Sequence, residues 1–238
     1  MSPAPALTDE IADRAARVQD QIAEAAVRAG RDPDAVTLVA VTKTHPVETV
    51  RAAVAAGLRD LGENRVQELV EKAEAVPGEA EGGEVRWHLI GSLQRNKARD
   101  AAAHADLFHA LDSVRLADAL EKRAAAADRV LPVLVQVNVS GEDAKHGVDP
   151  DAALDLVGAA AERPHLRPVG LMGMAAIAED ERDLDRLVRP AFRRLRGLFD
   201  SAPLPLSVLS MGMSGDFEVA VEEGATHVRL GTALFGAR

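Results

Sequence analysis

The stretch Thr37-Leu-Val-Ala-Val-Thr-Lys43 and the residues after it have the pattern of a strand, a helix and a second strand. The apolar run from Leu38 to Val41 ends at a polar pair, and the alanine-rich residues 47–56 have helical spacing. A second strand-like run follows at residues 60–63. The unit predicts two parallel strands, because a helical crossover brings the next strand back in the same direction.

This unit repeats through the chain, which has 238 residues. Eight repeats in about this length match the (β/α)8 barrel of the TIM type, so we expect an α/β protein with one barrel domain over residues 1–238. A doubly wound open sheet is the alternative fold. Helical stretches such as 114–127 and 184–199 separate the strand-like runs. These runs lie at residues 37–43, 60–63, 86–91, 107–111, 131–139, 166–175, 206–213 and 227–235.

Two segments lie outside the repeat. Thr8 or Asp9 can cap an additional N-terminal helix that extends to about Gly30 and has apolar residues on one face. Residues 74–84 are rich in Glu, Gly, Ala and Pro and have no periodicity. We expect this second segment to be a surface loop.

Composition restricts the partners and the compartment. The formal net charge is −10, which argues against nucleic acid and anionic membranes as partners. The chain has no cysteine, which excludes disulfides and thiolate metal sites and fits a reducing cytoplasm. We find no signal sequence, no run long enough to span a membrane and no long exposed apolar stripe. The expectation is a cytoplasmic protein that is a monomer.

Lys43 is the first candidate functional residue. Its amine lies where a buried strand is expected to end, at the edge of a barrel that normally carries the active site. A lysine amine condenses with an aldehyde to form an imine, which other common side chains do not do. A lysine that simply reaches into solvent is the alternative interpretation.

Two glycine-containing turns follow the last two predicted strands, at Ser214-Gly215 and Gly231-Thr232. Glycine lets backbone N–H groups approach an anion closely, and the two hydroxyls add donors. The position after strands seven and eight is also where such barrels bind phosphate. The pair therefore predicts a phosphate site. Strand alternation places Arg229 on the same face as Gly231.

Other candidates are weaker. The seven histidines lack the spacing of metal ligands, so no metal site is predicted. Lys145, in a loop after the fifth strand, could compete for an aldehyde, although a solvated loop lysine is the simpler interpretation. The arginine-rich helix at residues 182–196 is expected to present a solvated face.

Four motifs lie at the predicted strand ends. They are Val39-Ala-Val-Thr-Lys43, Gly62-Glu-Asn64, His88-Leu-Ile-Gly-Ser-Leu-Gln-Arg-Asn-Lys97 and Met211-Gly-Met-Ser214. With these motifs the chain resembles the pyridoxal phosphate homeostasis proteins, which are single-domain relatives of the alanine racemase barrel. Thr42 and Leu61 stand where the family more often has serine and tyrosine.

The resemblance implies a cofactor and a role for each site residue. Lys43 would bind pyridoxal phosphate as an aldimine, and Arg229 would face the pyridine nitrogen. Asn64 and His88 would line the pocket near the ring. The phosphate would be held by Ser214, Gly231 and Thr232.

The resemblance implies cofactor buffering and delivery to other enzymes, and two arguments favour this role over catalysis. An arginine stays protonated, so a pyridine nitrogen facing Arg229 would stay unprotonated and the ring would be a weak electron sink. Racemisation in the related enzymes uses a second base, a tyrosine from an extra domain, and this chain has no tyrosine. The predicted partners are therefore the cofactor and apo-enzymes that need it.

Two catalytic alternatives remain open at this point. The first is an amino-acid racemase or decarboxylase that uses the same cofactor, with weak activity. The second is a class I aldolase, in which Lys43 attacks the carbonyl of a sugar phosphate and Glu63 moves the proton.

Overall fold

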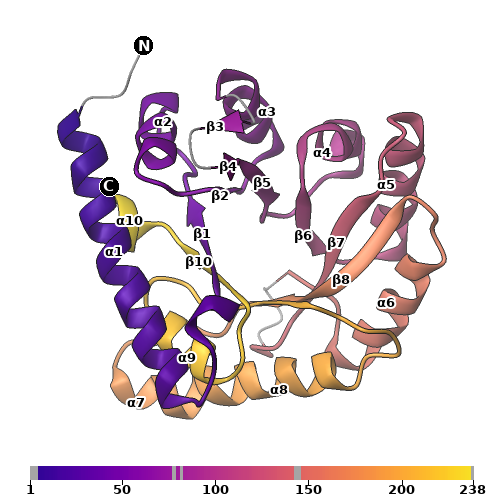
Figure 1. Ribbon diagram of the computed structural model, residues 1–238. Coiled ribbons are helices and arrows are strands. Elements are labelled where there is room, and N and C mark those ends of the chain that lie inside the picture. Colours follow the sequence, from indigo (N-terminus) through magenta and orange to yellow (C-terminus); the bar gives the residue numbers. More distant parts are fainter. Residues whose placement is uncertain (1–4, 77–78, 81–82, 142–145, 237–238) are drawn as a thin grey trace.

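The predicted barrel is present. The computed structural model describes residues 5–76, 79–80, 83–141 and 146–236. Within these ranges, strands pair in parallel and close into a barrel in the order β1-β10-β9-β8-β7-β6-β5-β2 (Figure 1). The strands are β1 (Thr37–Val41), β2 (Asp60–Glu63), β5 (Arg86–Leu89), β6 (Leu107–Leu111), β7 (Leu131–Val137), β8 (Leu166–Gly173), β9 (Val208–Ser210) and β10 (His227–Leu230).

Helices surround the barrel because each crossover buries one apolar face on the strands. Figure 1 shows them as an outer ring. The core between the two layers is aliphatic, and Phe108 and Phe192 are its largest fully buried side chains. The helices of this ring are α2 (Val47–Ala55), α3 (Val66–Ala75), α4 (Ala98–His104), α5 (Val114–Ala126), α6 (Ala153–Ala161), α8 (Arg189–Asp200), α9 (Phe217–Glu222) and α10 (Thr232–Phe235).

The N-terminal helix α1 (Pro5–Arg28) packs beside α2, α9 and α10 (Figure 1). Its Arg28 forms ion pairs with Glu218 and Glu222, both in α9, at 2.9 Å. The expected helix is therefore present, but its start was predicted wrongly, because Thr8 lies inside it. Pro5 fits the first turn, where a missing N–H costs nothing.

Two further expectations need correction. Residues 74–84 do not form only a loop, because β3 (Glu79–Ala80) and β4 (Gly83–Glu84) pair as a short antiparallel hairpin. The predicted helix at 184–199 is not a uniform α-helix either. It begins with α7 (Glu181–Asp183) and a π-helical turn (Leu184–Val188) before α8. Pro190, in the first turn of α8, cannot donate a backbone N–H, which fits a change of helix type there.

Candidate functional site

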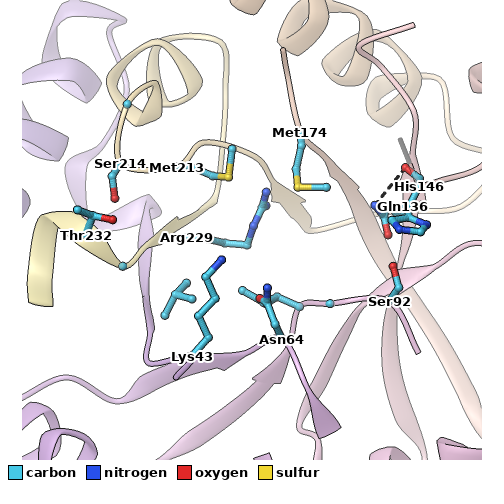
Figure 2. A pocket seen from close by; sticks show the side chains of 15 residues that line it. Lys43, Asn64, Ser92, Gln136, His146, Met174, Met213, Ser214, Arg229 and Thr232 are labelled. Atoms are coloured by element: carbon cyan, nitrogen blue, oxygen red, sulfur yellow. Dashed lines mark hydrogen bonds between the residues drawn. The ribbon is translucent and has the colours of Figure 1, made fainter. Parts of the chain in front are cut away.

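A cavity of about 440 Å³ opens at the carboxyl ends of the strands. Its size is within the range of small-molecule sites. Six of the seven residues that the sequence proposed for the site line this cavity (Figure 2). They are Lys43, Asn64, Ser214, Arg229, Gly231 and Thr232.

Hydrogen bonds below Lys43 hold its turn in place. The Thr42 hydroxyl donates to Glu63 Oε1 at 2.6 Å, and the Thr42 carbonyl accepts from Lys72 Nζ at 2.8 Å. Lys72 Nζ also lies 2.7 Å from Glu63 Oε1. On the other side of Lys43, Thr44 has a φ of 64°, and its N–H donates to Glu68 at 2.7 Å. A non-glycine residue in this conformation needs such support, so these contacts hold the backbone on both sides of Lys43.

Glu63 belongs to this support and does not line the cavity. It is fully buried, and burial raises its pKa, although hydrogen bonds from Lys72 and Thr42 oppose that effect. Its Oε2 atom has no hydrogen-bond partner in the described structure. The geometry therefore gives Glu63 a structural contact with Lys72 and no contact with the cavity that an aldolase proton shuttle would need.

Arg229 lines the cavity, and the end of the Lys43 side chain points toward it (Figure 2). Its NH1 donates to Ser210 Oγ at 2.7 Å and its NH2 donates to the Gly173 carbonyl at 3.2 Å. Burial lowers the pKa of Arg229 to about 10, and Asp216 opposes this shift. The guanidinium is thus a cation at neutral pH. Lys43 is a second basic side chain in the cavity, and no acidic residue is among the described residues that line it. The site attracts anions.

The two glycine-containing turns meet at one side of the cavity. Ser214 Oγ accepts from the backbone N–H of Ala233 at 3.3 Å, which joins the turn after β9 to the turn after β10. Ser214 and Thr232 lie next to each other in Figure 2. Asp216 closes the first turn by accepting from the Met213 N–H at 2.5 Å. The arrangement leaves two hydroxyls and the Gly215 and Gly231 backbone at the cavity wall.

His88, which the resemblance placed in the pocket near the ring, does not line this cavity. His88 lies in β5, two residues before Ile90, which follows the end of the strand, and of these two residues only Ile90 lines the cavity. Two residues along a strand correspond to about 7 Å, so His88 lies one layer deeper in the barrel. There it contacts Asp60 and His109, and it lines a separate cavity at the amino ends of the strands.

Several lining residues were missing from the sequence-based set. Gly91 is required by a close approach, because a Cβ there would lie 2.2 Å from the Asn64 carbonyl oxygen. Gln136 donates to the His146 carbonyl at 3.2 Å and so closes another side of the cavity (Figure 2). The position of Gln136 near the end of β7 was the available signal. Lys145 lies outside the described residues. Val41, Ile90, Ser92, Met174 and Met213 also line the cavity.

Across the described ranges, no helix is both long and apolar enough to cross a membrane. The same part of the chain contains no group of three His, Cys, Asp or Glu side chains that could hold a metal ion.

Comparisons with known proteins agree over most of the chain. Residues 14–238 match the family model described as alanine racemase, N-terminal domain. The chain is 45% identical over 229 residues to the pyridoxal phosphate homeostasis protein of Pseudomonas aeruginosa, with 96% of each chain covered. It is 43% identical over 230 residues to the protein of the same name from Aquifex aeolicus, which covers 95% of this chain and 97% of that one.

Solved structures are similar over the same length. PipY of Synechococcus elongatus, solved with pyridoxal phosphate bound, has a TM-score of 0.76 and 35% identity, covering 95% of this chain and 100% of that chain. Alanine racemase of Streptomyces lavendulae has a TM-score of 0.74 but 22% identity, and the match covers 97% of this chain and 58% of that one. The second likeness shows the shared barrel alone. The chain therefore belongs to the family of pyridoxal phosphate homeostasis proteins, within the wider group that has the alanine racemase N-terminal domain.

Proposed function

We propose that this protein holds pyridoxal phosphate as a Schiff base at Lys43 and buffers and delivers the cofactor inside the cell. The observation that carries the proposal is the placement of Lys43, Arg229 and both glycine-containing turns in one cavity. The relatives support it, because they are named homeostasis proteins rather than enzymes. PipY, which is 35% identical, was solved with pyridoxal phosphate bound.

The described side chains fit each part of this cofactor. Lys43 offers an amine to the aldehyde, and Arg229 offers N–H groups to the ring nitrogen. The turns at Ser214 and Thr232 offer hydroxyl and backbone donors to the phosphate, on a wall without acidic residues. When bound, pyridoxal phosphate supplies an electron-withdrawing ring that can activate an amino acid attached to it.

Arg229 and the composition favour holding over catalysis. A guanidinium has only donors, so it leaves the lone pair of the ring nitrogen in place and the ring remains a weak electron sink. The chain has no tyrosine that could act as a second base. Both features support a protein that retains the cofactor without efficient racemisation.

Borohydride reduction and peptide mapping test the binding site. We expect a yellow protein whose pyridoxyl mass is found on the peptide that contains Lys43. A colourless protein that stays unlabelled after pyridoxal phosphate is added would overturn the proposal and favour the aldolase.

Mixing the loaded protein with an apo-enzyme that needs the cofactor tests the delivery role. We expect the apo-enzyme to gain activity while amino acids incubated with the loaded protein alone keep their configuration. Rapid racemisation by the protein alone would favour the enzymatic alternative.

The double variant Ser214→Ala/Thr232→Ala should retain the cofactor poorly during dialysis. It loses two hydroxyl donors to a charged phosphate, each worth about 1.5–3 kcal/mol. Equilibrium dialysis followed by absorbance measures the dissociation constant, which should rise by at least about tenfold for each donor lost. Ser92→Ala is the matched control, because it removes a hydroxyl from another part of the cavity wall. Equal retention by the double variant and the wild type would place the phosphate elsewhere.

A further inference from the structure

A row of hydrogen bonds crosses the barrel interior below the cavity. Asp60 Oδ1 lies 2.9 Å from His88 Nε2, and His88 Nδ1 lies 2.9 Å from His109 Nε2. His109 Nδ1 lies 3.0 Å from Ser210 Oγ. Ser210 Oγ accepts from Arg229 NH1 at 2.7 Å. The row thus connects the guanidinium in the cavity to a carboxylate at the amino ends of the strands.

The row spans the barrel and does not follow its wall. Asp60, His88 and His109 belong to the neighbouring strands β2, β5 and β6, whereas Ser210 and Arg229 belong to β9 and β10. Strands β7 and β8 separate β6 from β9, so the contact between His109 and Ser210 passes through the interior. None of the five residues is more than 7% exposed. Hydrogen bonds in such a place are strong and polarise one another.

The chemistry of the two ends determines which atom donates and which accepts at each hydrogen bond of the row. A carboxylate can only accept, so His88 Nε2 donates to Asp60. The remaining contacts are completed when His88 Nδ1 accepts from His109 Nε2 and His109 Nδ1 accepts from the Ser210 hydroxyl. The opposite direction would make both His109 and Arg229 donate to Ser210, whose hydroxyl hydrogen would then lack an acceptor among the described contacts. Only the first direction satisfies every polar atom of the row.

The charges agree with this direction. Burial lowers the pKa of His109 well below its ordinary value, and the neighbouring His88 and Arg229 lower it further, so His109 is neutral. Burial raises the pKa of Asp60, but hydrogen bonds from His88 and Arg86 outweigh that effect and hold it at about 2. The row therefore connects a cation at Arg229, past the neutral His109 ring, to an anion at Asp60.

We infer that Ser210, His109 and His88 are positioning residues that fix the Arg229 guanidinium and couple it to Asp60 at the far end of the barrel. The coupling to a cofactor ring rests on the proposed function. With NH1 bound to Ser210 and NH2 to the Gly173 carbonyl, the guanidinium has one orientation toward the cavity. A change at either end of the row is then transmitted to the other end.

The Asp60 end of the row can be reached from a second cavity. Asp60 and His88 line the separate cavity at the amino ends of the strands, which has a volume of about 330 Å³. The same cavity contains Asp106, a second carboxylate that accepts from the Trp87 N–H at 2.8 Å and has no contact with the row. Asp106 is therefore a matched control for Asp60.

Nuclear magnetic resonance of protein with nitrogen-15 in its histidines tests the row directly. In cofactor-free protein we expect His88 and His109 to be Nε2–H tautomers with hydrogens protected from exchange. Asp60→Asn should shift the Nε2–H resonances of both rings, because it removes the terminal charge. Asp106→Asn should leave both in place. The proposed row would be contradicted if the His109 Nε2–H resonance did not move in Asp60→Asn, or if it moved equally in Asp106→Asn.

Loading with pyridoxal phosphate tests the coupling separately. Both Nε2–H resonances should shift on loading, although neither ring lines the cofactor cavity, and Ser210→Ala should abolish that shift while the cofactor still binds. If the cofactor binds to the wild type but neither Nε2–H resonance shifts, the coupling is contradicted and the proposed function stands. A protein that binds no cofactor would instead contradict the proposed function. If Ser210→Ala does not fold, the loaded Asp60→Asn variant provides the test. Its absorption maximum should differ from that of loaded Asp106→Asn, and equal maxima would contradict the coupling.

Discussion

Lys43→Ala is expected to abolish covalent capture of pyridoxal phosphate. Without the amine, no carbon–nitrogen bond can form, and only the polar contacts of the two glycine-containing turns and Arg229 remain. Borohydride treatment should leave the protein without a pyridoxyl mass, and the absorption band of the imine should disappear. Lys43→Arg should give the same loss, since a guanidinium keeps the charge but does not condense with an aldehyde under these conditions.

Lys122→Ala is the matched control for this experiment. Lys122 is an exposed residue of α5, on the outer ring of helices and outside the cavity lining. Its removal should leave the labelling unchanged. Labelling of Lys43→Ala at the wild-type level would show that another lysine carries the cofactor, and Lys145 would then be the first to map.

Lys72→Met is expected to cause the largest loss of stability. It removes the cation that pairs with Glu63 at 2.7 Å, and both side chains are almost completely buried. Breaking a buried ion pair by removing one partner costs about 3–5 kcal/mol, because the other charge stays buried without compensation. The free energy of unfolding in urea should fall by about that amount, with the slope on denaturant unchanged.

Two controls separate the buried charge from the loss of a side chain. The double variant Glu63→Gln/Lys72→Met removes the uncompensated charge and should recover part of the loss. Arg28→Met breaks two ion pairs of an arginine whose side chain is 47% exposed, and it should cost less than about 1 kcal/mol. If Lys72→Met were as stable as the wild type, the ion pair between Glu63 and Lys72 would not be a support of the turn at Lys43.

The barrel was predictable because its signal is local. Each strand-like run and each helical stretch has its own periodicity, and parallel closure follows from their alternation. The residues at the carboxyl ends of the strands could be read in the same way, which placed Lys43, Ser214 and Arg229 in one cavity. The hairpin at β3 and β4 was missed because its paired segments are only two residues each, too short for a periodic pattern.

The depth of a side chain inside the barrel could not be predicted from the sequence. His88 lies in β5 and Ile90 just after it, and the stagger of neighbouring strands decides which of the two reaches the cavity. The contact between His109 and Ser210 joins residues from strands that are not neighbours. Such contacts depend on closure of the barrel, so no local sequence pattern predicts them.

The pairing of β1 with β10 places the proposed site on the seam of the barrel, where the first and last strands meet. Lys43 follows β1, while Arg229 and Thr232 belong to β10 and the turn after it, so the pocket is incomplete until this final edge is joined. Because a ligand that binds only the closed barrel stabilises it by mass action, pyridoxal phosphate bound as proposed would oppose the separation of β1 from β10.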